Sequence, residues 1–577
     1  MRGVFSLLMS MVAAQSIALN PTDTASNFRL FDHVGGSHEL HYFSDRKAVV
    51  LLVQDLSCTS ATDGALQQVL AEHGDDIAVF KINPAQPRQV VADEVATADV
   101  PVLIDDAQLV GRTYGLERAG EAIVIDPTTW RIAYRGDTES GFAAAVGSLV
   151  NGARVSRSTT IARGCDIVYE PHDGAQISYA EEIVPILAEN CVSCHRQGGI
   201  GPWAMSDYNM IRGFSLMMRE VLLTKRMPPW HADPVVGHWA NDRSLAREDL
   251  KKLVSWIDAG APRGPADQAD PLLAIGGVQG KWGKLGEPDL IIDIPPTDVP
   301  ATGVVDYQYK YVSNPLEQDV WVRASQIVPG DRSVLHHVIT RFGEVETEGP
   351  RKGRLKRSAT IGGGLAGYVP GAEERPLPDG TGTFFPAGAT IEFQMHYTTS
   401  GAATTDHSQI GIYFHEQQPE HRINGMILAN GRIRIPPFAS HHAETAVRTF
   451  DKDVLVYSIL PHSHYRGKAA RFVADYPDGS SEVLLNVPNY DFNWQTTYLL
   501  KEPKFMPAGT TITYTNWWDN SAQNLANPDP AKEVRWGQQS FEEMIFGAIS
   551  YRLVKPEERE RLSKGSRPAA EVTGGME

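Results

Sequence analysis

The spacing of apolar residues changes at about residue 290, so the chain must combine at least two architectures. Before this point, apolar runs typical of strands alternate with runs at helical spacing. After it, short runs of alternating apolar and polar residues recur between turns, and no long helical pattern appears. With 577 residues, and about 150 for a typical domain, three or four domains are expected.

Charge and composition narrow the classes of function. The chain has 53 basic and 70 acidic side chains, which gives a net charge of −17 at pH 7. This sign is wrong for contacts with a phosphate backbone, so we expect no nucleic-acid partner. Beyond the N-terminus, no apolar run approaches the ~18 residues that span a bilayer, so stable membrane insertion is not expected either.

Residues 1–19 have the composition of a signal peptide. One basic residue, Arg2, precedes the apolar stretch Gly3–Ala14, whose last residues are small enough for signal peptidase. A buried N-terminal strand or helix is the alternative, because the segment carries a single charge. We interpret the segment as an export signal, which predicts a periplasmic or secreted protein.

Residues 20–160 alternate strand-like apolar runs with helical ones, as in a βαβ arrangement. The expected elements are Ala48–Val53, Gly64–His73, Ile77–Ile82 and Glu121–Ile125. Together with Cys58, which follows the first of these strands, they resemble the α/β thioredoxin-like and peroxiredoxin-like domains. The resemblance implies that a thiol at this turn is activated by a helix N-terminus, which favours the thiolate.

Two departures from that family weaken the case for redox chemistry at Cys58. Ala61 occupies the position of the second cysteine of a Cys-x-x-Cys pair, and Ala119–Gly120 stands where the family carries its cis-proline. We therefore interpret the domain as structural or degenerate, with a one-cysteine redox function as the alternative. Two of the four cysteines belong to the motif described next, which leaves Cys58 and Cys165 for at most one intrachain disulfide.

The string Cys191-Val192-Ser193-Cys194-His195 is the attachment motif of c-type haem. On one helical turn, the two thiols can add to the two vinyl groups of haem while the adjacent imidazole reaches the iron. A zinc site would need a second Cys or His pair nearby, and a redox dithiol would suit a cytosolic chain. We therefore predict one covalently bound haem in a small α-helical cytochrome c domain, residues 164–268, that transfers single electrons.

Further residues of this region resemble the cytochrome c pattern. Gly198–Pro202 looks like the loop whose carbonyl orients the proximal histidine, and Met227 lies on a turn as the distal methionine of that family does. A thioether at that position would raise the reduction potential. Met205 and His231 are competing distal ligands. The apolar spacing of Leu245–Ala259 predicts the last helix of the domain.

The remaining chain divides into a linker, two β domains and a tail. Residues 269–289 are rich in Gly, Pro and Asp and are expected to be a linker. The short alternating runs that follow favour two tandem antiparallel β-sandwiches, residues 290–430 and 431–555. Residues 556–577 are charged and poor in apolar residues, which indicates a frayed tail. The expected strands are Asp319–Ala324, Val334–Arg341, Thr390–Tyr397, Gln409–Phe414, Val454–Leu460 and Thr511–Thr515.

Five histidines in the β region have a spacing that suits metal ions. His462 and His464 are two residues apart, so on a strand both side chains lie on the same face and can bind one ion. His336 and His337 are adjacent and would point apart on a regular strand. Both can therefore bind one ion only at an irregularity, such as a bulge or a strand end. His396 supplies the fifth imidazole.

These histidines, with a methionine after a polar turn, resemble the copper type II, ascorbate-dependent monooxygenases, the family of peptidylglycine α-hydroxylating monooxygenase and dopamine β-hydroxylase. The resemblance implies one copper ion in each sandwich, facing a solvent-filled cleft. Three imidazoles suit electron delivery, whereas a thioether favours Cu(I), the state that binds O₂ before a hydrogen atom is removed from the substrate. The implied ligands are His336, His337 and His396 for the first copper, and His462, His464 and Met544 for the second.

The implied reaction hydroxylates a C–H bond of a small molecule with one atom of O₂, and it needs two electrons. Family members take these from ascorbate, whereas here we expect the fused haem to deliver them after reduction by an external donor. Peptide-amidating members hold a carboxylate with a basic residue two positions before the His-x-His pair and polar residues just after the Met. This chain has Leu460 at the first position, then Ile545, Phe546 and Ala548. We therefore expect a weakly polar or neutral substrate.

Two other functions compete with a monooxygenase. The first is a non-catalytic electron-transfer or copper-holding protein that keeps the ligands without a substrate pocket. The second is a peroxidase that depends on haem or on the thiol of Cys58. Substrate-dependent O₂ uptake distinguishes the monooxygenase from the non-catalytic protein, and Cys58→Ser would abolish thiol-dependent peroxide reduction.

Overall fold

The computed structural model describes residues 19–565 with gaps at 59–62, 96–97, 99, 172–173, 266–269, 276–280, 347, 349–354, 356–363 and 372–375. The predicted signal peptide lies outside the described residues except for Leu19. Within the described ranges, no helix has the length and the apolar character needed to cross a membrane.

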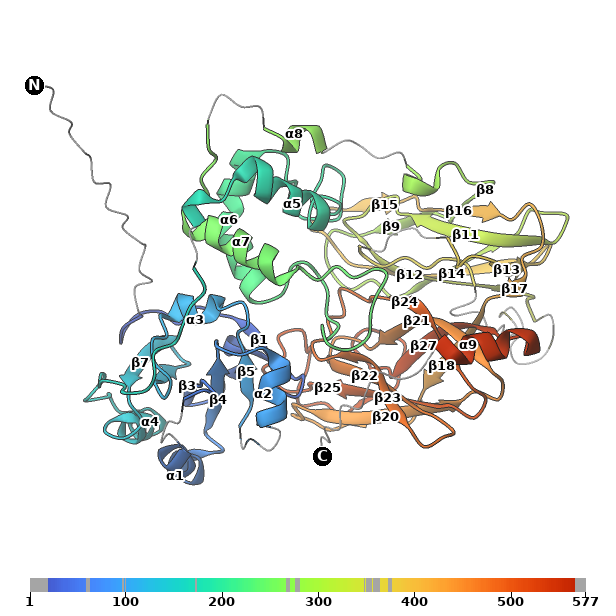
Figure 1. Cartoon of the computed structure of the whole chain (residues 1–577). Coiled ribbons are helices and arrows are strands. Elements are labelled where there is room, and N and C mark those ends of the chain that lie inside the picture. Colours follow the sequence, from blue (N-terminus) through green and yellow to red (C-terminus); the bar gives the residue numbers. More distant parts are fainter. Residues whose placement is uncertain are drawn as a thin grey trace, which may run out of the picture. The chain divides into compact units, whose positions relative to one another are not determined.

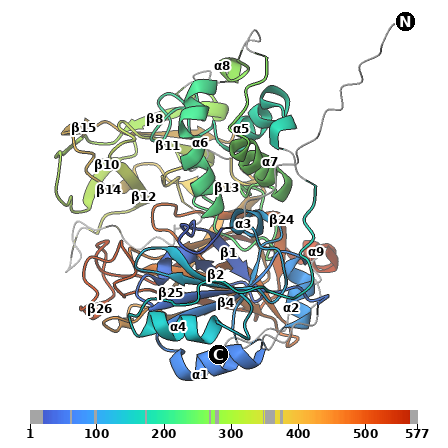
Figure 2. The same ribbon diagram turned by 90° about the vertical axis from the view of Figure 1, so that its left-hand side faces the viewer.

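The described chain forms two compact units. Figure 1 and Figure 2 label helices and strands of both units. The first unit contains the chain up to Asn190, together with Asp207–Pro228 and Leu245–Leu273. The second contains Cys191–Ser206, Pro229–Ser244 and the chain from Ala274 onward. The stretch predicted as a cytochrome domain, residues 164–268, is therefore divided between the two units.

The first unit is built on a seven-stranded sheet with the order β2-β1-β5-β4-β3-β6-β7. The strands β3, β4 and β5 are parallel, β6 runs antiparallel to β3, and β7 runs antiparallel to β6. All residues of β3 are buried, because helices cover both faces of the sheet. The strands are β1 (Arg29–Asp32), β2 (Ser37–Glu39), β3 (Ala48–Val53), β4 (Ile77–Asn83), β5 (Val102–Ile104), β6 (Ala122–Asp126) and β7 (Arg131–Gly136).

Successive residues of β3 point to opposite faces of this sheet and enter different cores. Val50 and Leu52 pack with α1 (Asp63–His73) and α4 (Phe142–Val150), which lie together on one side in Figure 2. Val49 and Leu51 pack with α3 (Leu109–Tyr114), while α2 (Arg88–Glu94) precedes β5. The strand order, with α1 between β3 and β4 and α4 after β7, confirms the predicted thioredoxin-like domain.

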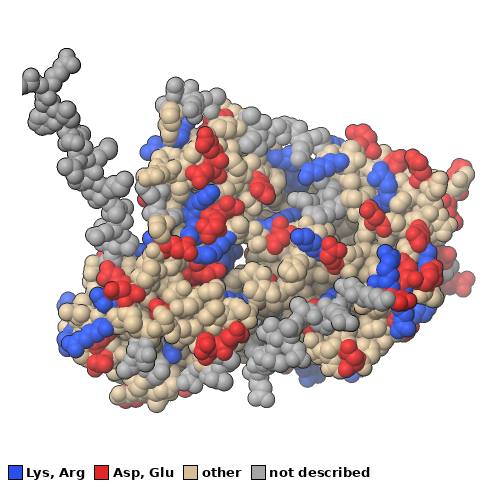
Figure 3. Space-filling model, viewed as in Figure 1, with Lys and Arg blue, Asp and Glu red and all other residues tan. Residues whose placement is uncertain are grey.

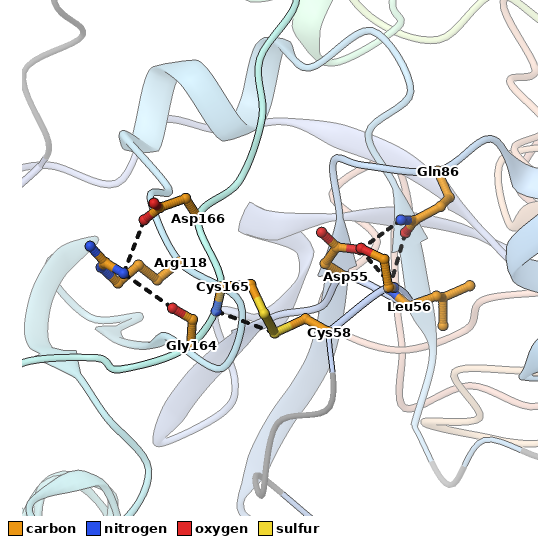
Figure 4. The surroundings of a disulfide bond; sticks show 9 residues. Asp55, Leu56, Cys58, Gln86, Arg118, Gly164, Cys165 and Asp166 are labelled. Carbon is orange, nitrogen blue, oxygen red and sulfur yellow. Dashed lines mark hydrogen bonds and ion pairs between the residues drawn. A yellow bond between two sulfur atoms is a disulfide. The ribbon is translucent and has the colours of Figure 1, made fainter.

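After α4 the chain returns along this domain. The backbone N–H of Arg135 donates to the carbonyl of Ser158 at 2.9 Å, and that of Ala119 donates to the carbonyl of Cys165 at 2.9 Å. A disulfide joins Cys58 to Cys165, 107 residues later (Figure 4). The turn after β3 is therefore covalently attached to the returning segment.

Three further helices belong to the first unit, α5 (Val184–Asn190), α6 (Tyr208–Leu223) and α7 (Arg247–Asp258). The observed α7 confirms the helix predicted from apolar spacing. Asp207 caps α6, because its side chain accepts a hydrogen bond from the N–H of Met210 at 3.1 Å. An ion pair of 2.6 Å between Arg219 and Asp258 connects α6 to the end of α7. The short α8 (Leu272–Ile275) follows.

The second unit begins with two mainly antiparallel sheets that pack face to face, hereafter the first sheet pair. One sheet has the order β10-β14-β12 and the other β17-β13-β11-β16-β8. Phe393 and Met395 of the first share a core with Val322 and Ile412 of the second. The strands are β8 (Leu290–Asp293), β10 (Gln308–Ser313), β11 (Val320–Val328), β12 (Leu335–Gly343), β13 (Thr381–Phe385), β14 (Thr390–Tyr397), β16 (Gln409–Phe414) and β17 (His421–Arg422), with β9 (Thr297–Val299) and β15 (Thr404–Asp406) in a small separate sheet.

A second sheet pair follows, with the orders β18-β27-β21-β24 and β20-β25-β22-β23. Val456 and Ile459 of β21 share its core with Phe472 of β22 and Ile512 of β25. The chain after residue 290 is thus β-rich, and each of the six expected strands is present. The strands are β18 (Asn424–Ala429), β20 (His442–Thr449), β21 (Val454–His462), β22 (Gly467–Asp475), β23 (Ser481–Val487), β24 (Tyr498–Met506), β25 (Thr511–Trp518) and β27 (Phe546–Leu553), with the short β19 (Arg434–Ile435) and β26 (Val534–Arg535) paired separately.

The segment Pro229–Ser244 runs beside the first residues of β24 in the second sheet pair. Its Ala240 N–H donates to the carbonyl of Leu499 at 2.7 Å, and Trp239 pairs with Leu500. The side chain of Asn241 both donates to the carbonyl of Thr497 and accepts from the N–H of Leu499. This segment, which was predicted to be part of a cytochrome domain, is therefore attached to the β-rich unit.

The expectation of a frayed tail from residue 556 is wrong for its first part. Residues Arg559–Gly565 form the helix α9, which a 3-10 turn at Pro556–Glu558 precedes. Glu558 forms an ion pair with Arg552 at 2.8 Å, and Arg559 forms one with Asp453 at 2.7 Å. Charged contacts thus attach a segment that has little apolar surface to bury.

Charged side chains of both signs are interspersed on the face of the molecule in Figure 3. This mixture accords with the composition, in which acidic side chains outnumber basic ones by 70 to 53. The absence of a nucleic-acid partner stays a prediction.

We expect the stability of the thioredoxin-like domain to depend on pH through Asp105, which follows β5. Burial raises the pKa of this carboxyl to about 7, although the backbone N–H of Gly111 donates to it at 2.6 Å. The folded protein then keeps a proton that the unfolded chain releases near the ordinary pKa of 3.8. The free energy of unfolding should therefore fall by about 1–4 kcal/mol between pH 4 and pH 7.

The variant Asp105→Asn should lose this dependence, because it cannot ionise. Hydrogen exchange of the β3, β4 and β5 amides measures the local free energy of opening. The stability gained by the variant over wild type should be larger at pH 8 than at pH 4.5. The control Asp75→Asn, at an exposed carboxyl before β4, should match wild type at both pH values. Equal differences at the two pH values would contradict the expectation.

Candidate metal centres and the cavity beside them

The three histidines predicted to share the first ion lie together on neighbouring strands. β12 carries His336 and His337, and β14 carries His396 opposite His337. The pairing of the two strands shifts register between Leu335 and His337, which is the irregularity that adjacent histidines require. As a result, Nδ1 of His337 lies 3.1 Å from Nδ1 of His336 and 3.1 Å from Nδ1 of His396. We call these residues the first histidine cluster.

All three side chains of this cluster are buried. Burial lowers the pKa of each ring, and neighbouring histidines lower it further for His337 and His396, to about 3 for His396. The rings are therefore neutral at pH 7, the form in which imidazole binds a metal ion. One ring nitrogen from each residue lies within 4.8 Å of the others, so the donor set fits a single ion.

His462 and His464 form the second histidine cluster, at the end of β21, with ring centroids 5.2 Å apart. Nδ1 of His462 contacts Oε1 of Gln495 at 2.8 Å, and Nδ1 of His464 contacts the carbonyl oxygen of Glu542 at 3.2 Å. Because both partners are acceptors, we assign the proton to Nδ1 in each ring, which leaves the Nε2 lone pairs for a metal. Burial lowers the pKa to about 4 for His462 and about 3 for His464.

Met544 is attached to the same turn by Glu543, a residue that the sequence analysis did not single out. Oε2 of Glu543 accepts hydrogen bonds from the backbone N–H of His464 at 2.9 Å and of Met544 at 3.3 Å. The carboxylate also accepts from the N–H of Arg466 at 2.6 Å and from the indole of Trp518 at 3.0 Å. Burial raises the pKa of Glu543 to about 7, and these donors oppose the rise.

Phe492 contacts both histidine clusters. Its ring stacks on His336 with centroids 5.0 Å apart, and it meets His464 edge-on at 5.9 Å. Phe492 lies after β23 in the second sheet pair, so a residue from one sheet pair covers histidines of the other. The two clusters are therefore neighbours across a shared aromatic ring.

A cavity of about 560 Å³ adjoins both clusters. His337 of the first cluster and both histidines of the second line it, and Met544 faces the same space. The structure thus places His396 beside its predicted partners His336 and His337. It places Met544 in the wall of the cavity that its predicted partners His462 and His464 also line. Apolar side chains form much of the remaining wall, namely Ile339, Leu460, Leu499, Trp536 and Phe546.

The predicted haem motif forms one helical turn after α5. The N–H of His195 donates to the carbonyl of Cys191 at 2.9 Å, and both Cys191 and Cys194 are free thiols. Nδ1 of His195 contacts the carbonyl of Trp203 at 3.1 Å, which leaves Nε2 for a metal. Sequence resemblance placed this orienting carbonyl within Gly198–Pro202, so the prediction was wrong by one residue.

The loop after the haem motif needs a glycine at position 201, because its backbone lies against the His195 ring. A Cβ at this position would lie 2.7 Å from Nδ1 of His195, so any side chain would displace the imidazole. Burial, opposed by the hydrogen bond to Trp203, lowers the pKa of His195, and burial raises that of Cys191 to about 12. A protonated Cys191 thiol is a weak nucleophile, which argues against a reactive dithiol, and a neutral His195 imidazole is the form that binds a metal ion.

The distal haem ligand stays a prediction. Met227 follows α6 in the first compact unit, whereas His195 belongs to the second. Of the competing residues, Met205 is buried and its N–H donates to the carbonyl of His195 at 2.8 Å. His231 is also buried, in the segment along β24.

Cys58 was predicted to be either a redox-active thiol or the partner of Cys165 in a disulfide, and the structure shows the disulfide. The sulfur of Cys58 is bonded to Cys165, whose own N–H contacts it at 3.2 Å (Figure 4). Asp55 at the same turn accepts hydrogen bonds from Ser57 and Gln86. A disulfide carries no thiolate, so a one-cysteine function would first require reduction.

One further group, Glu420, His421 and Glu558, has the spacing of metal ligands. These carboxylates already pair with cations, since Glu558 contacts Arg552 and Glu420 contacts Lys555 at 3.1 Å. The cluster is explained as a surface ion-pair network.

Comparison with known proteins identifies no family, because no protein-family model and no curated protein matches the chain. Among solved structures, a hypothetical protein from Sinorhizobium meliloti is 23% identical over 27% of this chain and 97% of that chain, with a TM-score of 0.24. A putative thiol:disulfide interchange protein DsbE from Chlorobium tepidum is 17% identical over 23% and 99%, with a TM-score of 0.21. The exposed lipoprotein thioredoxin of Streptococcus pneumoniae is 18% identical over 22% of this chain and 99% of that chain, with a TM-score of 0.20. Such low scores carry no argument, so the thioredoxin-like assignment rests on the strand order described above.

Glu543 provides a test of the second centre. We expect Glu543→Gln to weaken copper binding at His462, His464 and Met544 by about 10–100-fold, because the amide places a donor among N–H donors and loosens the turn. Competition with a Cu(I) chelator measures the affinity. The neighbouring Glu542→Gln keeps the backbone carbonyl that orients His464 and should bind copper as wild type does. Equal affinities for both variants would contradict the assigned role of Glu543.

Proposed function

We propose that this protein is a copper-dependent monooxygenase that hydroxylates a C–H bond of a small molecule with O₂, and that its own c-type haem supplies electrons. The observation that carries the proposal is the pair of buried histidine clusters beside one cavity, with Met544 in its wall. When bound there, copper ions would supply O₂ activation and one-electron transfer.

The residues of the two centres suit different tasks. His336, His337 and His396 offer three imidazole nitrogens within 4.8 Å and no thioether, a set that supports cycling between oxidation states. The thioether of Met544 beside His462 and His464 favours Cu(I). Gln495 and the carbonyl of Glu542 fix the ring orientation of the second pair.

Part of the cavity wall is apolar next to the second histidine cluster. Leu460 and Phe546 line it next to the second cluster, and Leu499 and Trp536 extend the apolar surface. Apolar walls exclude water, which protects reactive species from side reactions and holds an apolar C–H group near Met544.

The residues of the haem motif suit a covalently bound cofactor. Cys191 and Cys194 are the free thiols that would form thioether bonds, and His195 would be the proximal ligand, oriented by Trp203. When bound, the haem would supply one-electron transfer.

Tyr368 is paired with the strand of the first histidine cluster and lies within electrostatic range of Cys194 in this motif. Its backbone exchanges two hydrogen bonds of 2.9 Å with Val338, the residue after His337. Burial raises the pKa of its hydroxyl, and the nearby Cys194 contributes to the rise. This proximity supports the assignment of the haem motif and the copper ligands to one reaction.

Metal content and O₂ consumption test the proposal. The purified full-length protein should hold two coppers and one haem per chain, and a hydroxylated product should carry one atom of isotopically labelled O₂. Substrate-independent O₂ uptake without a labelled product would instead indicate a non-catalytic electron carrier and would overturn the monooxygenase.

The electron supply has its own test. We expect His336→Ala to slow the reoxidation of reduced haem by O₂ by about tenfold or more, because the high effective concentration of a linked acceptor is lost. Stopped-flow absorbance of the haem measures the rate. The control His442→Ala, at a histidine of β20 that pairs with Glu444, should leave the rate unchanged. Equal rates in all three proteins would exclude this supply route.

A further inference from the structure

The cavity beside the histidine clusters has an unbalanced charge. Three arginines line it, Arg243, Arg332 and Arg341, and among its described lining residues there is no Asp, Glu or Lys. The position before the His-x-His pair and those just after Met544 hold apolar residues, so the sequence alone predicted no counter-charge for an anion.

One of the three arginines is already neutralised. Arg341 on β12 contacts Glu392 on β14 at 3.3 Å. Arg243 donates to the carbonyl of Gly371, and Arg332 lies beside the hydroxyl of Tyr368 and lowers its pKa against the effect of burial. Within the described ranges, neither Arg243 nor Arg332 forms an ion pair with a carboxylate.

A buried hydrogen-bond donor faces the same cavity. Gln495 is 6% exposed, and its Oε1 is occupied by His462. Its Nε2 has no hydrogen-bond partner among the residues that the structure describes. A buried amide donor without a partner is costly, so a ligand that accepts its hydrogen bond would be stabilised.

Arg243 reaches this cavity from an unexpected part of the chain. It belongs to the segment Pro229–Ser244, which lies between the haem motif and α7 in the sequence. The Arg243 side chain packs closely against Gly371 and Trp494. A Cβ on Gly371 would lie 3.1 Å from a guanidinium nitrogen of Arg243 and 3.1 Å from the Trp494 ring. Trp494 precedes Gln495, so the arginine and the unpartnered amide belong to the same region of the wall.

We propose that the cavity selects small organic carboxylates with an apolar body, and that Arg243 and Arg332 hold the carboxylate. A carboxylate is an acceptor only, so it matches guanidinium and amide donors, and charge-assisted hydrogen bonds are the strong ones. The apolar wall at Leu460, Leu499 and Phe546 accommodates the body of the ligand. That such a carboxylate is the substrate rests on the proposed function, whereas the binding of the anion does not depend on copper.

Binding to the full-length protein tests the proposal directly. The probes are 4-phenylbutyrate and octanoate, each compared with its primary amide, which has the same shape without the charge. Calorimetry should give acids that bind about tenfold tighter than amides, and the difference should shrink at high salt. Amides that bind as tightly as the acids, or no binding of either acid at millimolar concentration, would overturn the proposal.

Matched variants locate the anion. Arg243→Gln and Arg332→Gln should each reduce the preference for acid over amide about tenfold while leaving amide binding unchanged. Arg341→Gln alters an arginine that is already paired and should keep the preference. Circular dichroism verifies that each variant folds. A loss of preference in Arg341→Gln equal to that in the other two would overturn the assignment.

The outcome separates this inference from the proposed function. Acids that bind but yield no labelled product would refute the monooxygenase and leave the carboxylate site standing. A labelled product from the neutral amides, with none from the acids, would support the monooxygenase and overturn the carboxylate selection.

Discussion

The hydrogen bonds of the buried Glu543 carboxylate are the interaction on which the proposed second copper site depends. The carboxylate accepts hydrogen bonds from the backbone of His464, Arg466 and Met544, and so it holds two segments of the chain at one point. A carboxylate without water is costly unless donors surround it, and here the turn after β21 supplies them. Removing the carboxylate would leave several buried N–H groups without partners, which explains why the ligand geometry and the local fold cannot vary independently.

Burial also determines the protonation state of both histidine clusters. It lowers the pKa of the rings, to about 3 for His396 and about 4 for His462, so the imidazoles keep their lone pairs. Phe492 contacts both clusters, and Arg243 contributes to the wall of the cavity beside them. The proposed copper ligands and the proposed carboxylate site therefore depend on one packed region of the second unit.

Much of the local structure could be predicted from residue patterns. The strands Thr390–Tyr397 and Gln409–Phe414 were predicted to the residue, because alternation along a strand is a short-range signal. The requirement for an irregularity at His336 and His337 was also confirmed, by the register shift in β12. Glu543 escaped prediction, because nothing in the sequence distinguishes a buried glutamate from an exposed one. The helix α9 was missed because ion pairs, rather than apolar spacing, hold it.

Residue types and their spacing determined the two histidine sets, the turn of the haem motif, and the change from α/β structure to β-rich structure, because these depend on neighbours within a few residues. Tertiary structure alone decided that Cys58 is paired with Cys165, that Trp203 orients His195, and that arginines distant in the sequence line the cavity. Each of these depends on contacts between segments that only packing brings together. Local periodicity carries no information about which segment a given side chain will meet.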